Sequence, residues 1–114
     1  MILYIFTDTY QRYQEATGVI TVRNRLEELA QDACLILHYS RVSLKTIKRI
    51  QPWAICHSGS ATLFEEYDVL KNSAYRQVVR TCCVPQIGFC GGHQVIAKFF
   101  GSSLGPIRKL RPTE

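Results

Sequence analysis

The chain has no long hydrophobic run: segments such as residues 33–37 are far shorter than the ~18 apolar residues that a membrane span requires. Low-complexity tracts and internal repeats are also missing, and an apolar content of 46% excludes a disordered chain. The N-terminal MILYIF follows no basic segment and meets Asp8 almost at once, which argues against a signal peptide. We therefore expect a cytoplasmic protein without a membrane partner.

Disulfide and metal-binding patterns are missing as well. The five cysteines are an odd number and form no C-x-x-C pair, so they do not make a disulfide framework. The three histidines form no H-x-x-x-H pair, which argues against zinc. Cys34 and Cys56 lie in strand-like runs, where a thiol packs as a small hydrophobic group. We expect no metal and no cofactor.

Acidic residues are missing from much of the second half of the chain. The net charge is +5, from 14 basic and 9 acidic residues, yet residues 69–113 contain seven basic residues and no acid. A solvated positive face is the commonest cause of such a bias. Nucleic-acid binding is disfavoured, because the basic residues are scattered and no binding motif accompanies them. A third interpretation is that this surface meets acidic residues supplied from outside the chain.

What the sequence does contain is a regular alternation of strand and helix patterns. Apolar runs predict four strands, at residues 2–6, 33–39, 53–57 and 84–89. Helical patterns lie at residues 19–33, 44–50 (with Ser43 as the cap), 69–83 and 92–100. With 114 residues the chain is the size of one domain. We expect an α/β fold of the flavodoxin-like or Rossmann-like class, a parallel sheet with helices on both faces.

Two glycine-bearing loops follow the third and fourth predicted strands, SGS at 58–60 and GFCGGHQ at 88–94. In parallel sheets, ligands bind at the carboxyl ends of the strands, so we expect both loops at one rim. The spacing Gly88-x-Cys90-x-Gly92 is the cysteine form of a nucleophile elbow. A sharp strand-to-helix turn of this kind leaves room only for small residues beside the nucleophile.

An elbow at Cys90 has two chemical consequences. The thiol sits where the following helix directs its free N–H groups and the positive end of its dipole, which stabilises the thiolate. The backbone N–H of Gly91 can also donate to the oxyanion that forms when Cys90 attacks a carbonyl. A buried, inert thiol is the alternative interpretation of Cys90.

Residues 85–101, PQIGFCGGHQVIAKFFG, resemble the nucleophile segment of class I (triad-type) glutamine amidotransferases, whose pattern is G-x-C-x-G-x-Q. The residues that fall on this pattern are Gly88, Cys90, Gly92 and Gln94. The resemblance implies that Cys90 attacks the side-chain amide of glutamine, gives a glutamyl thioester and releases ammonia. It also implies that Gln94 helps to hold the glutamine substrate.

The upstream SGS resembles the oxyanion loop of the same family, usually Ser-Gly-Gly-Pro, with Ser60 and Ala61 in place of the last two residues. The resemblance implies that Gly91, together with Gly59 or Ser60, supplies the oxyanion N–H groups. The family fold is the parallel sheet predicted above, so the resemblance extends over the whole chain in topology.

One part of the family's machinery has no counterpart in this sequence. The family takes its general base from a His-x-Glu segment far downstream of the elbow, and no histidine follows His93. His93 fits a helix residue packed beside the turn, and His57 fits a hydrogen-bonded structural histidine better than a surrogate base. We therefore expect residues 1–114 to be a single, truncated amidotransferase-like domain, incomplete relative to the family domain. A complementing C-terminal half or a synthetase (acceptor) domain is the expected partner.

Two further functions remain open. The fold and the cysteine also suit another cysteine hydrolase, such as a gamma-glutamyl peptidase. A non-catalytic regulatory module could keep the fold for binding alone. For the isolated chain we expect little or no glutaminase activity, and poor solubility or self-association because an apolar sheet edge is left exposed.

Overall fold

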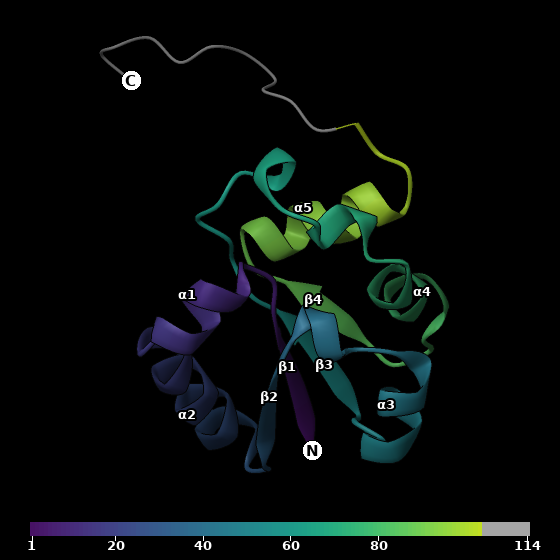
Figure 1. The fold of residues 1–114 in the computed structure, drawn as a ribbon. Helices are drawn as coiled ribbons and strands as arrows, with labels where there is room; N and C mark the ends of the chain where they lie inside the picture. Colours follow the sequence, from purple (N-terminus) through teal and green to yellow (C-terminus); the bar gives the residue numbers. More distant parts are fainter. Residues whose placement is uncertain (104–114) are drawn as a thin grey trace, which may run out of the picture.

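The computed structural model describes residues 1–103 and places a parallel sheet at the centre of the molecule (Figure 1). Its four strands are β1 (Ile2–Phe6), β2 (Cys34–His38), β3 (Ala54–His57) and β4 (Gln86–Gly88). They lie in the order β2-β1-β3-β4, and every neighbouring pair is parallel. This order agrees with the flavodoxin-like arrangement, although that arrangement has one more strand. The predicted fold class is confirmed.

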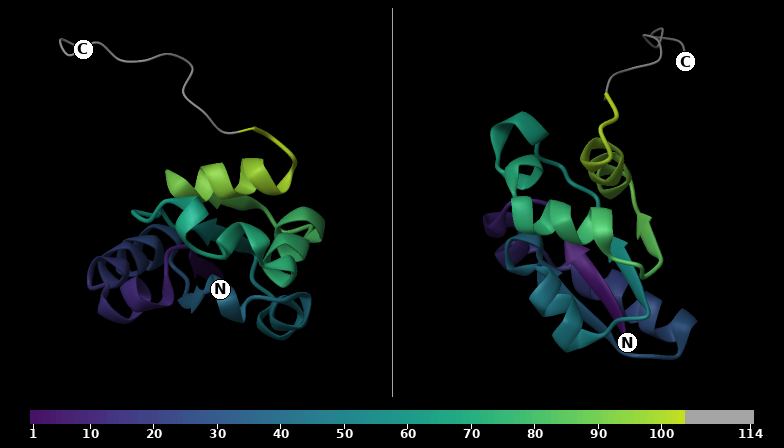
Figure 2. Two further views of the ribbon diagram at one scale, coloured as in Figure 1. Left: turned by 45° about the horizontal axis from the view of Figure 1, so that its top comes forward. Right: turned by 90° about the vertical axis from the view of Figure 1, so that its right-hand side faces the viewer.

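Helices cover both faces of the sheet, as the views in Figure 2 show. The α-helices are α1 (Tyr10–Glu15), α2 (Gly18–Ala30), α3 (Leu44–Ile50), α4 (Ser73–Thr81) and α5 (Gly91–Phe99). Short 3-10 turns, η1 (Tyr39–Arg41), η2 (Phe64–Glu66) and η3 (Val69–Lys71), lie between them. No helix within residues 1–103 is both long enough and apolar enough to cross a membrane.

The core has two parts because successive side chains of β1 point to opposite faces. Leu3 and Ile5 pack on the face that α3, α4 and α5 cover, where they join residues such as Tyr75 of α4. Ile2 and Tyr4 pack on the face that α2 covers. Every residue of β1 is buried, which explains its unbroken apolar run.

The structure differs from the sequence predictions in two helices. Residues 69–83 form η3 followed by α4, because the side chain of Asn72 accepts a hydrogen bond from the amide of Tyr75 and starts a new helix there. Helix α1 was not predicted; its amphipathic pattern is weak, and Thr9 caps it by accepting from the amide of Arg12. The predicted cap of α3 is confirmed, since Ser43 accepts from the amide of Thr46.

The outer strands are less buried than their apolar sequences suggest. β2 is an edge strand, and the side chain of Leu35 is 37% exposed. β4 forms the opposite edge, where Ile87 is 53% exposed and the adjacent Phe89 is 39% exposed. The prediction of an exposed apolar edge therefore holds at β4, next to the cysteine turn.

Candidate functional site

Cys90 occupies the turn between β4 and α5, and its backbone is in an unusual conformation. Its φ is 49° and its ψ is −111°, whereas the other non-glycine residues of positive φ in residues 1–103, Gln31 and Gln51, are ordinary left-handed helix ends. A residue with a side chain reaches such angles only when the surrounding structure enforces them. Cys90 is exposed. The buried-thiol interpretation is therefore wrong.

The glycine spacing around Cys90 has a steric cause on each side. A Cβ on Gly88 would lie 2.4 Å from the amide nitrogen of His93, and one on Gly92 would lie 2.4 Å from the carbonyl oxygen of His57. Both contacts are with backbone atoms, which cannot rotate away as a side chain can. The start of α5 is thus packed directly on the ends of β3 and β4. The sequence prediction that the turn tolerates almost no side chains holds at both positions.

The structure brings the SGS loop and the cysteine turn together. A Cβ on Gly91 would lie 2.7 Å from the amide nitrogen of Ser60, and a Cβ on Gly59 would lie 3.6 Å from the Cβ of Cys90. The amides of Gly59, Ser60 and Gly91 donate to no acceptor within residues 1–103. Three backbone donors without an acceptor in this part of the chain therefore lie in the loop and the turn that meet at Cys90.

Gln94 lies one helical turn after the cysteine. Its amide donates to the carbonyl of Cys90 across 3.3 Å, and its side chain is exposed on α5. It is therefore on the same rim of the sheet as Cys90 and the SGS loop. The residues that the sequence analysis assigned to one site do lie together.

Neither protein-family models nor curated proteins match this chain.

Two residues at the end of β1 hold the SGS loop in place. Thr7 donates its amide to Ser58 Oγ and its hydroxyl to the Ser58 carbonyl, both at 2.8 Å. The carboxylate of Asp8, which is 3% exposed, accepts from the amide of Ala61 at 2.8 Å. Burial raises the pKa of Asp8, but hydrogen bonds from Thr62, Ala61 and Thr9 outweigh it, so the pKa lies below its usual value. Asp8 is therefore a charged anchor for the loop.

Tyr67, directly after η2, completes this support. The hydroxyl of Tyr67 donates to the Thr7 carbonyl at 2.6 Å and lies 2.8 Å from Ser60 Oγ. Burial raises the pKa of Tyr67 to about 12, so the hydroxyl remains protonated and keeps both contacts. Thr7, Asp8 and Tyr67 were not predicted from the sequence as part of the site. The available signal was the polar Thr7-Asp8 pair directly after the most buried apolar run.

Two of the three histidines are buried and held by other groups. His57 is fully buried, with Nδ1 2.6 Å from the Tyr75 hydroxyl and Nε2 2.8 Å from Gln86 Oε1. Burial lowers its pKa to about 4, although the contact with Gln86 opposes the shift. His57 is thus a structural histidine, as the sequence analysis favoured.

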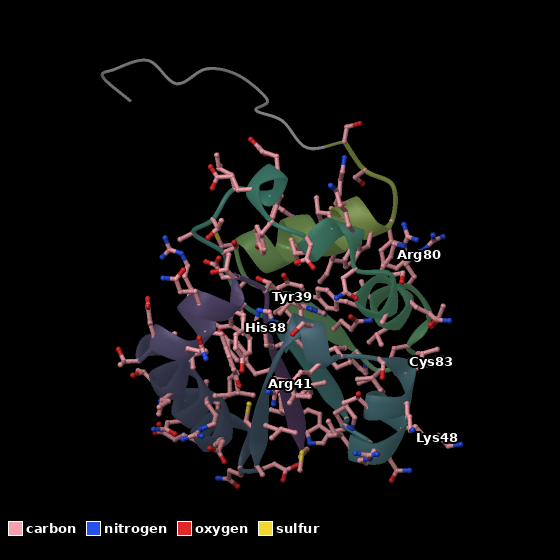
Figure 3. All side chains as sticks on the ribbon, in the orientation of Figure 1. His38, Tyr39, Arg41, Lys48, Arg80 and Cys83 are labelled. Carbon is pink, nitrogen blue, oxygen red and sulfur yellow. The ribbon has the colours of Figure 1, made fainter. Side chains whose placement is uncertain are left out.

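The other two histidines differ from each other in burial. His38 is 1% exposed, and its ring nitrogens contact Ser40 Oγ and the carbonyl of Asp8, both at 2.7 Å. Figure 3 shows it beside Tyr39, within the body of the protein. His93 lies in α5, three residues after Cys90; its backbone nitrogen packs against Gly88, and its side chain is exposed.

The other four cysteines differ from Cys90 in their burial or in their place in the fold. Cys34 and Cys56 are buried in β2 and β3, and burial raises the pKa of the Cys34 thiol to about 11. Cys82 follows the last residue of α4, and Cys83 is exposed beyond it (Figure 3). Cys83 is therefore an exposed thiol without an elbow, and it provides an internal reference for the reactivity of Cys90.

Proposed function

We propose that this chain is a glutamine amidotransferase-type domain of class I, with Cys90 as the nucleophile. The observation that carries the proposal is the exposed thiol on a strained turn whose neighbouring amides, from Gly91, Gly59 and Ser60, are free to donate. This observation supports acyl transfer, since the negative charge that develops on the carbonyl oxygen needs preorganised donors and these amides are the proposed ones.

In the proposed reaction, the Cys90 sulfur attacks the side-chain amide carbon of glutamine. The carbonyl oxygen becomes an oxyanion and accepts hydrogen bonds from Gly91 and from Gly59 or Ser60. The carbon–nitrogen bond then breaks, the nitrogen takes up a proton and leaves as ammonia, and a glutamyl thioester remains on Cys90. Water hydrolyses the thioester to glutamate and regenerates the thiol. Gln94, one turn along α5, is the proposed contact for the glutamine substrate.

The base for this reaction is proposed to come from a partner. All three histidines of the chain lie in the described residues, and two of them are buried with both ring nitrogens in contact with other groups. The apolar side chains of Ile87 and Phe89 are exposed at the β4 edge, next to Cys90, and could be covered by such a partner. A complementing C-terminal half or a synthetase domain fits this role.

The proposal is tested by treating the chain with a chloroketone analogue of glutamine and mapping the labelled residue by mass spectrometry. We expect labelling at Cys90, protection by L-glutamine, and no protection by D-glutamine. Iodoacetamide, which has no glutamine portion, provides the control, because it should label the exposed Cys83 as well. Equal labelling of Cys83 and Cys90 by the glutamine analogue would contradict the proposal and favour a non-catalytic module.

A direct assay of ammonia release tests the missing base. We expect the chain alone to release little or no ammonia from glutamine, because its sequence contains no His-x-Glu segment to supply the base. Robust release by the purified chain, abolished in Cys90→Ala, would show that the base is present after all. Cleavage of a gamma-glutamyl peptide in preference to glutamine would instead support a peptidase of the same fold.

A further inference from the structure

A second surface of the molecule, away from the cysteine turn, gathers positive charge. Arg76 and Arg80 stand one turn apart on the exposed side of α4, and Lys98 lies near the end of α5. The three side chains line one hollow of about 360 Å³, together with Leu70, Phe99, Phe100 and Gly101. Figure 3 shows Arg80 extending from α4 away from the sheet. We call this region the α4–α5 surface.

The positive charges of the α4–α5 surface are uncompensated within residues 1–103. The ion pairs of this part of the chain all lie in residues 1–32, and the side chains of Arg76, Arg80 and Lys98 form no hydrogen bond with any residue of 1–103. Like charges at positions i and i+4 of a helix repel one another. An acidic group placed between them removes this repulsion, which makes the surface a complement for negative charge.

Aromatic side chains line part of the hollow on the α4–α5 surface, and the backbone there is held by hydrogen bonds. Phe100 is 59% exposed and borders the hollow, while Phe99 is buried beneath it. The end of α5 is closed by hydrogen bonds from the amides of Phe100, Gly101 and Ser102 to carbonyls of the last helical turn. Aromatic and arginine side chains are both enriched in protein interfaces.

Two features favour a protein ligand over a phosphate or a nucleic acid. Arg76 and Arg80 also line a second hollow of about 510 Å³ on the other side, so they form a ridge between two hollows and do not converge on one point. The next hollow along the surface includes Glu65 beside Lys71 and Lys98, which interrupts any continuous basic track for a nucleic-acid backbone.

We propose that the α4–α5 surface binds an acidic segment of a partner protein. An apolar side chain of that segment occupies the hollow beside Phe100, and flanking carboxylates pair with Arg76, Arg80 and Lys98. This interaction does not depend on the chemistry of Cys90.

The test uses a fluorescein-labelled peptide in which glutamates flank one phenylalanine, and measures its binding to the whole chain by fluorescence anisotropy. We expect saturable binding that weakens as ionic strength rises. The double variant Arg76→Gln, Arg80→Gln should weaken binding by about tenfold or more. The matched control, Arg23→Gln with Arg25→Gln on α2, lowers the net charge of +5 by the same two units and should change binding by less than about twofold.

Two further variants test the apolar part of the proposal. Replacing the peptide's phenylalanine by serine, or Phe100 by serine, should weaken binding while the charges stay the same. Equal losses in the two arginine double variants would mean attraction by overall charge and would overturn the proposal. It would also be overturned if inorganic phosphate at low millimolar concentration displaced the peptide, or if a single-stranded oligonucleotide bound more tightly than the peptide.

Discussion

Replacing Gly92 by alanine tests the packing of the cysteine turn. The new Cβ would lie 2.4 Å from the carbonyl oxygen of His57 and 2.6 Å from that of Ser58. Both atoms belong to the backbone at the end of β3, so α5 would have to move off the sheet to relieve the contacts. Overpacking typically lowers the unfolding free energy by roughly 1–3 kcal/mol, and we expect about 3 kcal/mol here because the contacted atoms cannot rotate away. Gly88→Ala, whose Cβ would lie 2.4 Å from the His93 amide nitrogen, should cost a similar amount.

Two other glycines provide matched controls for the same substitution. A Cβ on Gly18, in α2, would have no atom within 4 Å, so Gly18→Ala should be neutral or stabilise the fold by up to roughly 1 kcal/mol. Gly59→Ala would make an ordinary contact at 3.6 Å with the Cβ of Cys90 and should cost less than about 1 kcal/mol.

Urea unfolding followed by circular dichroism gives the four free energies. The expected order of stability is Gly18→Ala first, Gly59→Ala next, and the two elbow variants last. A Gly92→Ala protein within about 0.5 kcal/mol of the original, with an unchanged denaturant slope, would refute the close packing of α5 on β3.

Two further predictions concern buried groups around the rim. The pKa of His57 in the folded chain, about 4, lies below its usual 6.5. Between pH 6.5 and pH 4 the unfolded chain therefore binds a proton at His57 that the folded chain does not. The unfolding free energy should fall by up to roughly 3 kcal/mol as the pH drops through this range. His57→Gln should flatten this dependence, and an equally steep pH profile in that variant would contradict the assignment. Asp8→Asn should remove an acceptor from the Ala61 or Thr9 amide and lower the unfolding free energy by about 1–3 kcal/mol. Hydrogen exchange at the Ala61 amide should become faster. Unchanged exchange at Ala61 would mean that Asp8 does not hold the loop.

Local patterns in the sequence were sufficient for the strands and for the cysteine turn. The apolar run of β1 and the spacing of Gly88, Cys90 and Gly92 predict features that depend on neighbouring residues, and the structure has them. Helix α1 could not be predicted in this way, because its six residues are too few to show an apolar repeat. The exposure of Leu35 could not be predicted either, since an apolar run does not distinguish an edge strand from a central one.

The support of the SGS loop depends on contacts that no local pattern reveals. Asp8 and Ala61 are 53 positions apart, and Tyr67 reaches back 60 positions to the carbonyl of Thr7. Such pairs form only when β1 and β3 lie side by side in the sheet. The sequence could therefore indicate which residues carry the proposed chemistry, but not which residues hold them in position.

The most direct test of the central claim is a crystal structure of the chain with the glutamine chloroketone bound covalently to Cys90. We expect Cys90 to keep its positive φ, and the oxygen derived from the ketone to lie about 2.7–3.1 Å from the Gly91 amide nitrogen and from that of Gly59 or Ser60. An adduct whose oxygen faces solvent, with none of these amides within hydrogen-bond distance, would contradict the account.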